Sequence, residues 1–236
     1  MPSDQHGGSG EDDWQGRTPQ DAGEKGKMIA RFQNGGHDIT LFGGIKGLVR
    51  DGDDLRNELN QDHPDAIYIV LSREQIDGLS AFLKDPFELS MSDYEISYGL
   101  HLSVYGEVMT PPPIYIEAVK YAEENGKELK PLDVPEKEYS DFYVKNVKIF
   151  DLLRNSLRKR RVTRMEFGDT SPEDFVRRWE ETMNRVKGLK RVEDYRLSYI
   201  EGKIREYLSS ERGSTVFIIT ELEFYDQLKK FLSDGI

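Results

Sequence analysis

The chain has 236 residues, a formal net charge of −11 at pH 7 and no cysteine. Its length supports one well-buried domain, and the lack of cysteine excludes a disulfide scaffold, thiolate catalysis and thiolate-bound zinc. The acidic balance argues against a surface that binds nucleic acid throughout, and no segment approaches the roughly 20 apolar residues of a membrane span. We therefore expect a cytoplasmic protein that does not enter a membrane.

The N-terminal part of the chain changes character at Met28. Residues 1–27 combine glycine with charged and polar side chains and have almost no apolar surface to offset the entropy of ordering, which predicts a disordered, acidic, glycine-rich tail. From Met28, the β-rich segments MIARFQ and HDITLF flank the sequence Asn-Gly-Gly, which favours a tight turn with positive φ. We expect a β-hairpin at the start of one domain over residues 28–236.

A rhythm of strands and helices follows the hairpin. A glycine loop precedes DDLRNELNQ, which has the apolar spacing and acidic first turn of a helix, and residues 65–71 (DAIYIVL) are typical of a strand buried on both faces. Ser72 is the predicted N-cap of a helix over REQIDGLSAFL. Residues 85–110 fit either a helix or a strand, so their type stays open, and the prolines at 111–113 end that segment.

The second half of the chain is mainly helical until its last strand. IYIEAVKYAEENG predicts a helix closed by glycine, with a short strand over residues 128–132, and helical periodicity then runs over about 140–210. Residues 215–220 (TVFIIT) are typical of a buried strand, and ELEFYDQLKKFL predicts an amphipathic closing helix. The fold class is therefore α/β: a central, mostly parallel or mixed sheet flanked by helices, with an N-terminal hairpin and a helical insertion before the last strand.

The order of these segments carries a resemblance. Between residue 39 and the C-terminus, the chain contains five segments in a fixed order: LFGGIKGLV, PDAIYIVLSREQ, AVKYAEENGKELKPLDV, YRLSYIEGKIREYL and TVFIIT. This series resembles the TraB/PrgY family, itself similar to erythromycin-esterase-like, Tiki-type and ChaN-like proteins. In that family the first strand ends in G-T-x-H, the next carries V-x-V-E-L, a late helix carries E-R-D/N, and the last strand ends in G-x-G-H. The resemblance implies a metallohydrolase scaffold.

The polar residues that the resemblance assigns to the family's site are mostly replaced. The two motif histidines fall on Lys46 and Glu223 and the glutamate of V-E-L on Val70, whereas Asp133 and Arg196 match their motif positions. An ammonium group in place of an imidazole removes a lone pair and adds positive charge where a metal ion would lie. We expect no bound metal, no other cofactor and no catalytic activity of the family's type.

Our first hypothesis is a TraB/PrgY-like domain protein with a non-catalytic binding or regulatory role on a degenerate metallohydrolase scaffold. Its pocket would lie at the carboxyl ends of the strands and be formed by Gly43, Gly44, Lys46, Asp133 and Arg196, with Glu223 beside them. The expected partner is a small anionic ligand or an unknown protein. The alternative for the same residues is a structural network in which Lys46 and Arg196 neutralise Asp133 and Glu223.

The second hypothesis is a metal-dependent hydrolase or peptidase that uses the remaining carboxylates. The catalytic candidates are then Asp133, Arg196 and Glu223, with Glu221 as a further acid. Acids at the start of the last helix also have a simpler explanation, because they interact favourably with the helix dipole.

The third hypothesis is a surface for nucleic acid or for an acidic partner on the helical insertion. Its basic patch consists of Arg154, Arg158, Lys159, Arg160, Arg161 and Arg164. A solvated helix face explains the same charges, and the patch lacks the interleaved aromatic residues of single-strand binders. Long amphipathic helices of this kind also suit a homo-oligomer.

Overall fold

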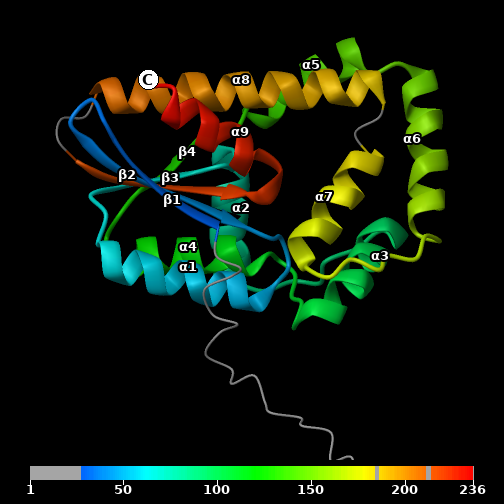
Figure 1. The fold of residues 1–236 in the computed structure, drawn as a ribbon, viewed down its shortest axis with the longest axis horizontal. Helices are drawn as coiled ribbons and strands as arrows, with labels where there is room; N and C mark the ends of the chain where they lie inside the picture. Colours follow the sequence, from blue (N-terminus) through cyan, green and yellow to red (C-terminus); the bar gives the residue numbers. More distant parts are fainter. Residues whose placement is uncertain (1–27, 184–185, 211–213, 236) are drawn as a thin grey trace, which may run out of the picture.

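The computed structural model of the chain describes residues 28–183, 186–210 and 214–235, so the tail expected over residues 1–27 lies outside the described residues. The described residues form a five-stranded mixed sheet flanked by helices (Figure 1). In sheet order the strands are β1 (Met28–Asn34), β2 (His37–Gly44), β5 (Thr215–Glu221), β3 (Ala66–Ile69) and β4 (Leu129–Pro131). β1 and β2 are antiparallel and the other pairs are parallel. The α/β class with its N-terminal hairpin is confirmed.

Helices cover both faces of the sheet, in the layers seen in Figure 1. One face carries α1 (Val49–Asp62), α2 (Arg73–Lys84) and α4 (Pro113–Glu124), and the other carries α8 (Lys187–Ser210) and α9 (Leu222–Ser233). β5 shows how the sequence divides the core, because Phe217 and Ile219 pack with the first layer whereas Val216 and Ile218 pack with the second. This alternation requires the continuous apolar sequence of TVFIIT.

A third group of helices extends the domain beyond the carboxyl ends of the parallel strands. It contains α3 (Asp93–Leu102) with a short 3-10 turn (Ser103–Tyr105), α5 (Glu136–Asn146), α6 (Ile149–Val162) and α7 (Pro172–Met183). The segment whose type stayed open in the sequence is thus helical over Asp93–Leu102. Its side chains join α7 in a separate core around Phe175 and Trp179, both fully buried. None of the helices in the described residues has the length and apolar character that crossing a bilayer requires.

Candidate ligand-binding site

The glycine loop after β2 places Lys46 at the carboxyl edge of the sheet. Gly43 and Gly44 allow close packing there: an added Cβ would lie 2.5 Å from the ring of Tyr225 at Gly43 and 2.7 Å from Ile114 at Gly44. Both glycines therefore allow the close contact of β2 with α9 and α4. Their small size brings Lys46 close to the end of β5.

The ammonium of Lys46 lies between two carboxylates. Its Nζ is 2.8 Å from Oε2 of Glu221, the last residue of β5, and 3.0 Å from Oε1 of Glu223 in the first turn of α9. The hydroxyl of Tyr115, from α4, donates a hydrogen bond to the other oxygen of Glu221. The parallel pairing of Gly44 with Glu221 produces this arrangement, because it aligns the ends of β2 and β5. We call Lys46, Glu221 and Glu223 the lysine cluster.

Burial and charge set different protonation states within the lysine cluster. Burial disfavours the Lys46 cation, but Glu221 and Glu223 outweigh it and hold the pKa of Lys46 well above its ordinary value. Burial acts against the charged form of Glu221 too, yet Lys46 and Arg196 lower its pKa to about 2. Burial and the neighbouring carboxyls Glu221 and Glu180 raise the pKa of Glu223 well above its usual range. Within the cluster, the ammonium of Lys46 and the carboxylate of Glu221 are therefore favoured, whereas Glu223 holds its proton to a higher pH than an ordinary carboxyl group does.

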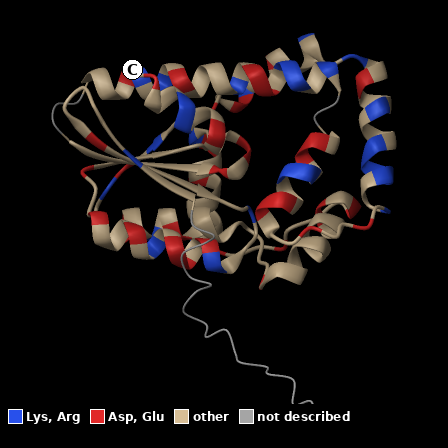
Figure 2. Ribbon diagram, viewed as in Figure 1, with Lys and Arg blue, Asp and Glu red and all other residues tan. Residues whose placement is uncertain are grey.

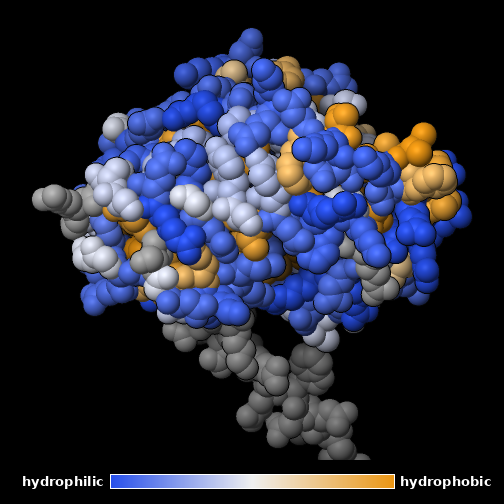
Figure 3. Space-filling view, turned by 90° about the horizontal axis from the view of Figure 1, so that it is seen from above, coloured by the Kyte–Doolittle hydropathy of each residue, from blue (hydrophilic) through white to orange (hydrophobic). Residues whose placement is uncertain are grey.

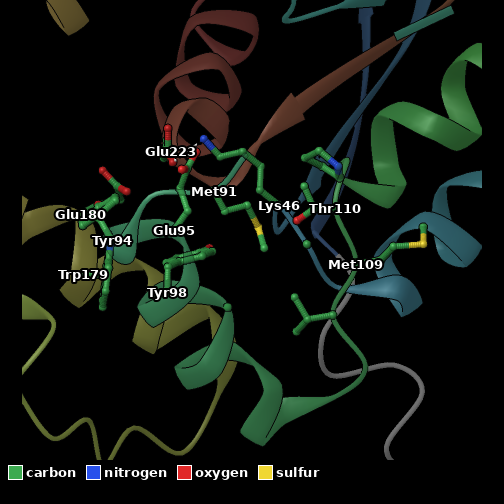
Figure 4. Close-up of a pocket in the computed structure, with 14 residues that line it drawn as sticks. Lys46, Met91, Tyr94, Glu95, Tyr98, Met109, Thr110, Trp179, Glu180 and Glu223 are labelled. Carbon is green, nitrogen blue, oxygen red and sulfur yellow. Dashed lines mark hydrogen bonds and ion pairs between the residues drawn. The ribbon is translucent and has the colours of Figure 1, made fainter. Parts of the chain in front are cut away.

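A cavity of about 340 Å³ opens beside the lysine cluster. Figure 4 shows Lys46 on one side, and Tyr94, Tyr98, Trp179 and Glu180 on the other. The aromatic wall is ordered by its own contacts: Trp179 Nε1 donates to the Tyr94 hydroxyl at 2.5 Å, and the Tyr98 and Trp179 ring centroids are 5.3 Å apart. Burial, with Glu193 and Glu221 as like charges, raises the pKa of Glu180. The cavity therefore combines aromatic rings with a polar end rich in carboxyl groups.

The remaining pair predicted from the sequence lies further along the same edge. Arg196 of α8 contacts the carboxylate of Asp133, with Nε 3.2 Å from both oxygens and Nη2 2.5 Å from Oδ2, and its Nη1 is 3.1 Å from Glu193. The Arg196 guanidinium also lies 4.9 Å from the ring centroid of Phe224. A shallow cavity that Lys46, Glu221 and Arg196 all line connects this pair to the lysine cluster. Lys46 thus pairs with Glu221 and Glu223, and Arg196 pairs with Asp133 and Glu193, so the two cations lie in an ion-pair network with Asp133 and Glu223.

Several site residues were not foreseen. Glu180 and Trp179 belong to the sequence RRWEET, whose charges are typical of a solvated helix, and Tyr94 and Tyr98 lie in the segment whose structure stayed open. Tyr115 follows the prolines and looks like an ordinary core residue. Only the packing of α3 and α7 against each other brings these side chains to the cavity.

Figure 2 marks the Lys and Arg residues of α6 in blue, but their side chains do not all face the same way. Arg158 turns toward α7 and donates to the carbonyl of Thr182 at 3.0 Å, and Lys159 lies 4.7 Å from the ring centroid of Tyr94. The exposed members are Arg154, Arg160, Arg161 and Arg164. The charge available to a partner is therefore smaller than the sequence indicates.

The donor groups at this edge do not fit a divalent metal. Lys46 places an ammonium between the carboxylates that would otherwise be ligands. Across residues 28–183, 186–210 and 214–235, no three His, Cys, Asp or Glu side chains are grouped so that they could hold a metal ion. Comparison with protein-family models and with curated protein sequences found no match.

Proposed function

We propose that this chain is a non-catalytic binding protein on a TraB/PrgY-like scaffold, and that its ligand is a small organic cation with an apolar part. The observation that carries the proposal is the position of the Lys46 ammonium, within 3.0 Å of both Glu221 and Glu223. On the resemblance to the TraB/PrgY family, Lys46 stands at the position of a motif histidine, so the protein's own cation would take the place of the metal ion.

Electrostatics supports the loss of metal chemistry. Two unit charges 4 Å apart repel each other by about 4 kcal/mol at an effective dielectric constant of 20, and a divalent ion would double that repulsion. Lys46 does not relieve this by losing its proton, because its pKa is raised by Glu221 and Glu223. A divalent ion would have to displace the ammonium from both carboxylates, so no hydrolytic step is assigned to a metal here.

The ligand class follows from the walls of the cavity. The small anion expected from the sequence would compete with Glu221 and Glu223 for Lys46. A cation meets the opposite situation, since Glu180 and Glu223 line the cavity and the pKa of each is raised by burial and by like charges. Such a ligand stabilises the ionised carboxylate and releases its proton. The aromatic rings of Tyr94 and Tyr98 also line the cavity, and aromatic rings attract cations.

Calorimetric titration tests the proposal. The probes are primary and quaternary arylalkyl amines, each paired with a carboxylate of the same size and shape, and every titration is repeated in two buffers that differ in ionisation enthalpy. We expect the amines to bind with proton release and their carboxylate partners to bind more weakly. Glu180→Gln and Glu223→Gln should weaken amine binding at least tenfold, whereas the exposed control Glu206→Gln should not. Tighter binding of the carboxylates, or no binding by any amine, contradicts the proposal.

One observation favours a second candidate, a metal-free hydrolase. A carboxyl group with a raised pKa keeps its proton to higher pH, and the protonated form is the one that acts as a general acid. The pKa of Glu223 is raised, and Glu223 lies beside a cavity. A screen against ester, amide and glycoside substrates tests this candidate. Activity that Glu223→Gln abolishes and that survives a metal chelator would favour the enzyme over the binding protein.

A further inference from the structure

Helix α6 exposes most of its apolar residues and turns several polar ones toward the protein. Ile149, Phe150, Leu153 and Leu157 are between 56% and 74% exposed, whereas Asn155 is half-buried on the side facing the neighbouring helices. α6 lies at one end of the molecule in Figure 1, and hydrophobic residues gather at the same end of the surface in Figure 3. An apolar surface of this kind, bordered by charge, is typical of an interaction site.

Polar contacts fix this orientation of α6. Asp151 caps its N-terminus by accepting from the backbone N–H of Lys148 at 3.0 Å, and the Asp151 carboxylate packs where a Cβ on Gly188 would lie 2.5 Å away. Arg158 donates to the carbonyl of Thr182 on α7. Rotating the helix to bury its leucines would break both anchors. The exposed apolar residues are therefore a stable property of the fold.

Basic residues at the end of α6 follow its exposed apolar residues along the helix axis and lie on the same face. At 100° per residue, Arg160 lies on the same line as Ile149 and Leu153, and Arg164 follows just beyond the helix end. The face is apolar for about 12 Å, from Ile149 to Leu157, and basic for about the next 6 Å, at a rise of 1.5 Å per residue. We call this surface, formed by Ile149, Phe150, Leu153, Leu157, Arg160, Arg161 and Arg164, the α6 face.

We propose that the α6 face docks an acidic amphipathic helix of another protein, whose apolar residues cover Ile149 to Leu157 and whose carboxylates meet Arg160, Arg161 and Arg164. This interaction is independent of the ligand proposed for the cavity. Charge complementarity selects this occupant, because a partner helix must present apolar residues opposite the apolar part of the α6 face and carboxylates opposite its basic part.

Two other occupants match this surface less well. An antiparallel pair of α6 helices from two copies would place Arg154 beside its own counterpart, because a twofold axis brings equivalent flanks together. A membrane-bound helix needs its apolar residues in one uninterrupted stripe, but insertion of the α6 face would carry Arg160 into the acyl region with Leu153. A folded partner helix avoids both costs by placing a carboxylate at that position.

The test uses fluorescence anisotropy with the full chain. The probe is a labelled helical peptide with leucines at i, i+4 and i+8 and glutamates along the adjoining flank, and its matched partner carries lysine at every glutamate position. We expect the acidic peptide alone to bind, and its affinity to fall as salt increases. The variants Leu153→Asp/Leu157→Asp and Arg160→Glu/Arg161→Glu should each weaken binding at least tenfold. Val104→Asp, at a site that is 80% exposed and outside α6, should leave binding unchanged.

Several outcomes overturn the proposal. Equal binding of the lysine peptide would show that charge does not select the partner, and tighter binding to vesicles of phosphatidylcholine and phosphatidylglycerol would assign the α6 face to lipid. A dimer in analytical ultracentrifugation that Leu153→Asp/Leu157→Asp dissociates would assign it to a second copy. Peptide binding that appears only in a Trp14→Ala variant would assign it to the chain's own segment Glu11–Trp14, which is also acidic and aromatic. Circular dichroism checks that each variant is folded.

Discussion

Replacing Lys46 with methionine keeps an unbranched side chain but removes the ammonium between Glu221 and Glu223. Breaking a fully buried ion pair by removing one partner costs about 3–5 kcal/mol, and breaking an exposed pair about 0–1 kcal/mol. The Lys46 side chain is 36% exposed and that of Glu221 is 8% exposed, so the pair lies between these limits. We expect the free energy of unfolding to fall by about 2–3 kcal/mol at pH 8.

The loss of unfolding free energy in Lys46→Met should become smaller as pH falls. In the native chain the pKa of Glu221 is lowered to about 2, so its contribution to stability is present above the ordinary carboxyl pKa and disappears as pH falls toward 2. In the Lys46→Met variant the largest influence that lowers the pKa of Glu221 is removed, so we expect this pKa to rise toward that of a buried carboxyl group. The carboxyl then takes up a proton as pH falls from 8 to 4.5, so the difference between the two proteins should shrink.

Urea unfolding at pH 8, 6.5 and 4.5 measures this difference. The matched control is Lys120→Met, because Lys120 lies 2.8 Å from Glu117 in an exposed pair whose removal should cost less than about 0.5 kcal/mol. A loss for Lys46→Met that is no larger than that of the control, or that stays constant with pH, would refute the reasoning about the lysine cluster.

Three further predictions concern single residues. The pKa of Glu223 is raised, so its contribution to stability is present below the ordinary carboxyl pKa and is lost as pH rises. Glu223→Gln should therefore gain stability relative to the native chain as pH rises above the ordinary carboxyl pKa, by about 1.4 kcal/mol for each tenfold change in proton affinity. A difference in urea unfolding that does not change with pH would contradict this. Gly52→Ala places a Cβ 2.7 Å from the Pro113 Cβ and should lower the free energy of unfolding by about 1–3 kcal/mol. In the control Gly78→Ala the new Cβ meets nothing within 4 Å, so the free energy of unfolding should rise by about 0.5–1 kcal/mol. Equal melting temperatures of the two variants would contradict this. Arg196→Lys loses the contact of two nitrogens with the Asp133 carboxylate and should lower the free energy of unfolding by about 1–2 kcal/mol. An unchanged melting temperature would rule this out.

Local sequence signals predicted the framework of the fold. The turn Asn34-Gly35-Gly36-His37 needs positive φ, and Gly35 and Gly36 adopt 58° and 83°. The type of residues 85–110 could not be decided, because their apolar residues fit two periods. Ser92 starts a helix with a capping box, but the contact of Tyr98 with Trp179 across the separate core supplies the burial. That contact joins residues far apart in sequence, so no local pattern contains it.

The sequence predicted those residues of the candidate site that lie near the ends of strands. Lys46 and Glu223 lie near the ends of adjacent strands, which sequence position alone indicates. The pairing of Lys46 with Glu221 depends on the register of β2 against β5, which the sequence does not determine. Glu180 reaches the cavity only because α7 packs there, and its charged neighbours resemble those of a solvated helix.

The metal content of the protein tests most sharply whether Lys46 excludes a divalent ion. Untagged protein is purified without chelators, dialysed against manganese, cobalt or zinc, and measured by elemental analysis. We expect substoichiometric metal in every case, because Lys46 retains its position between Glu221 and Glu223. One equivalent of tightly held divalent ion, lost when Glu221 is replaced with glutamine, would contradict it.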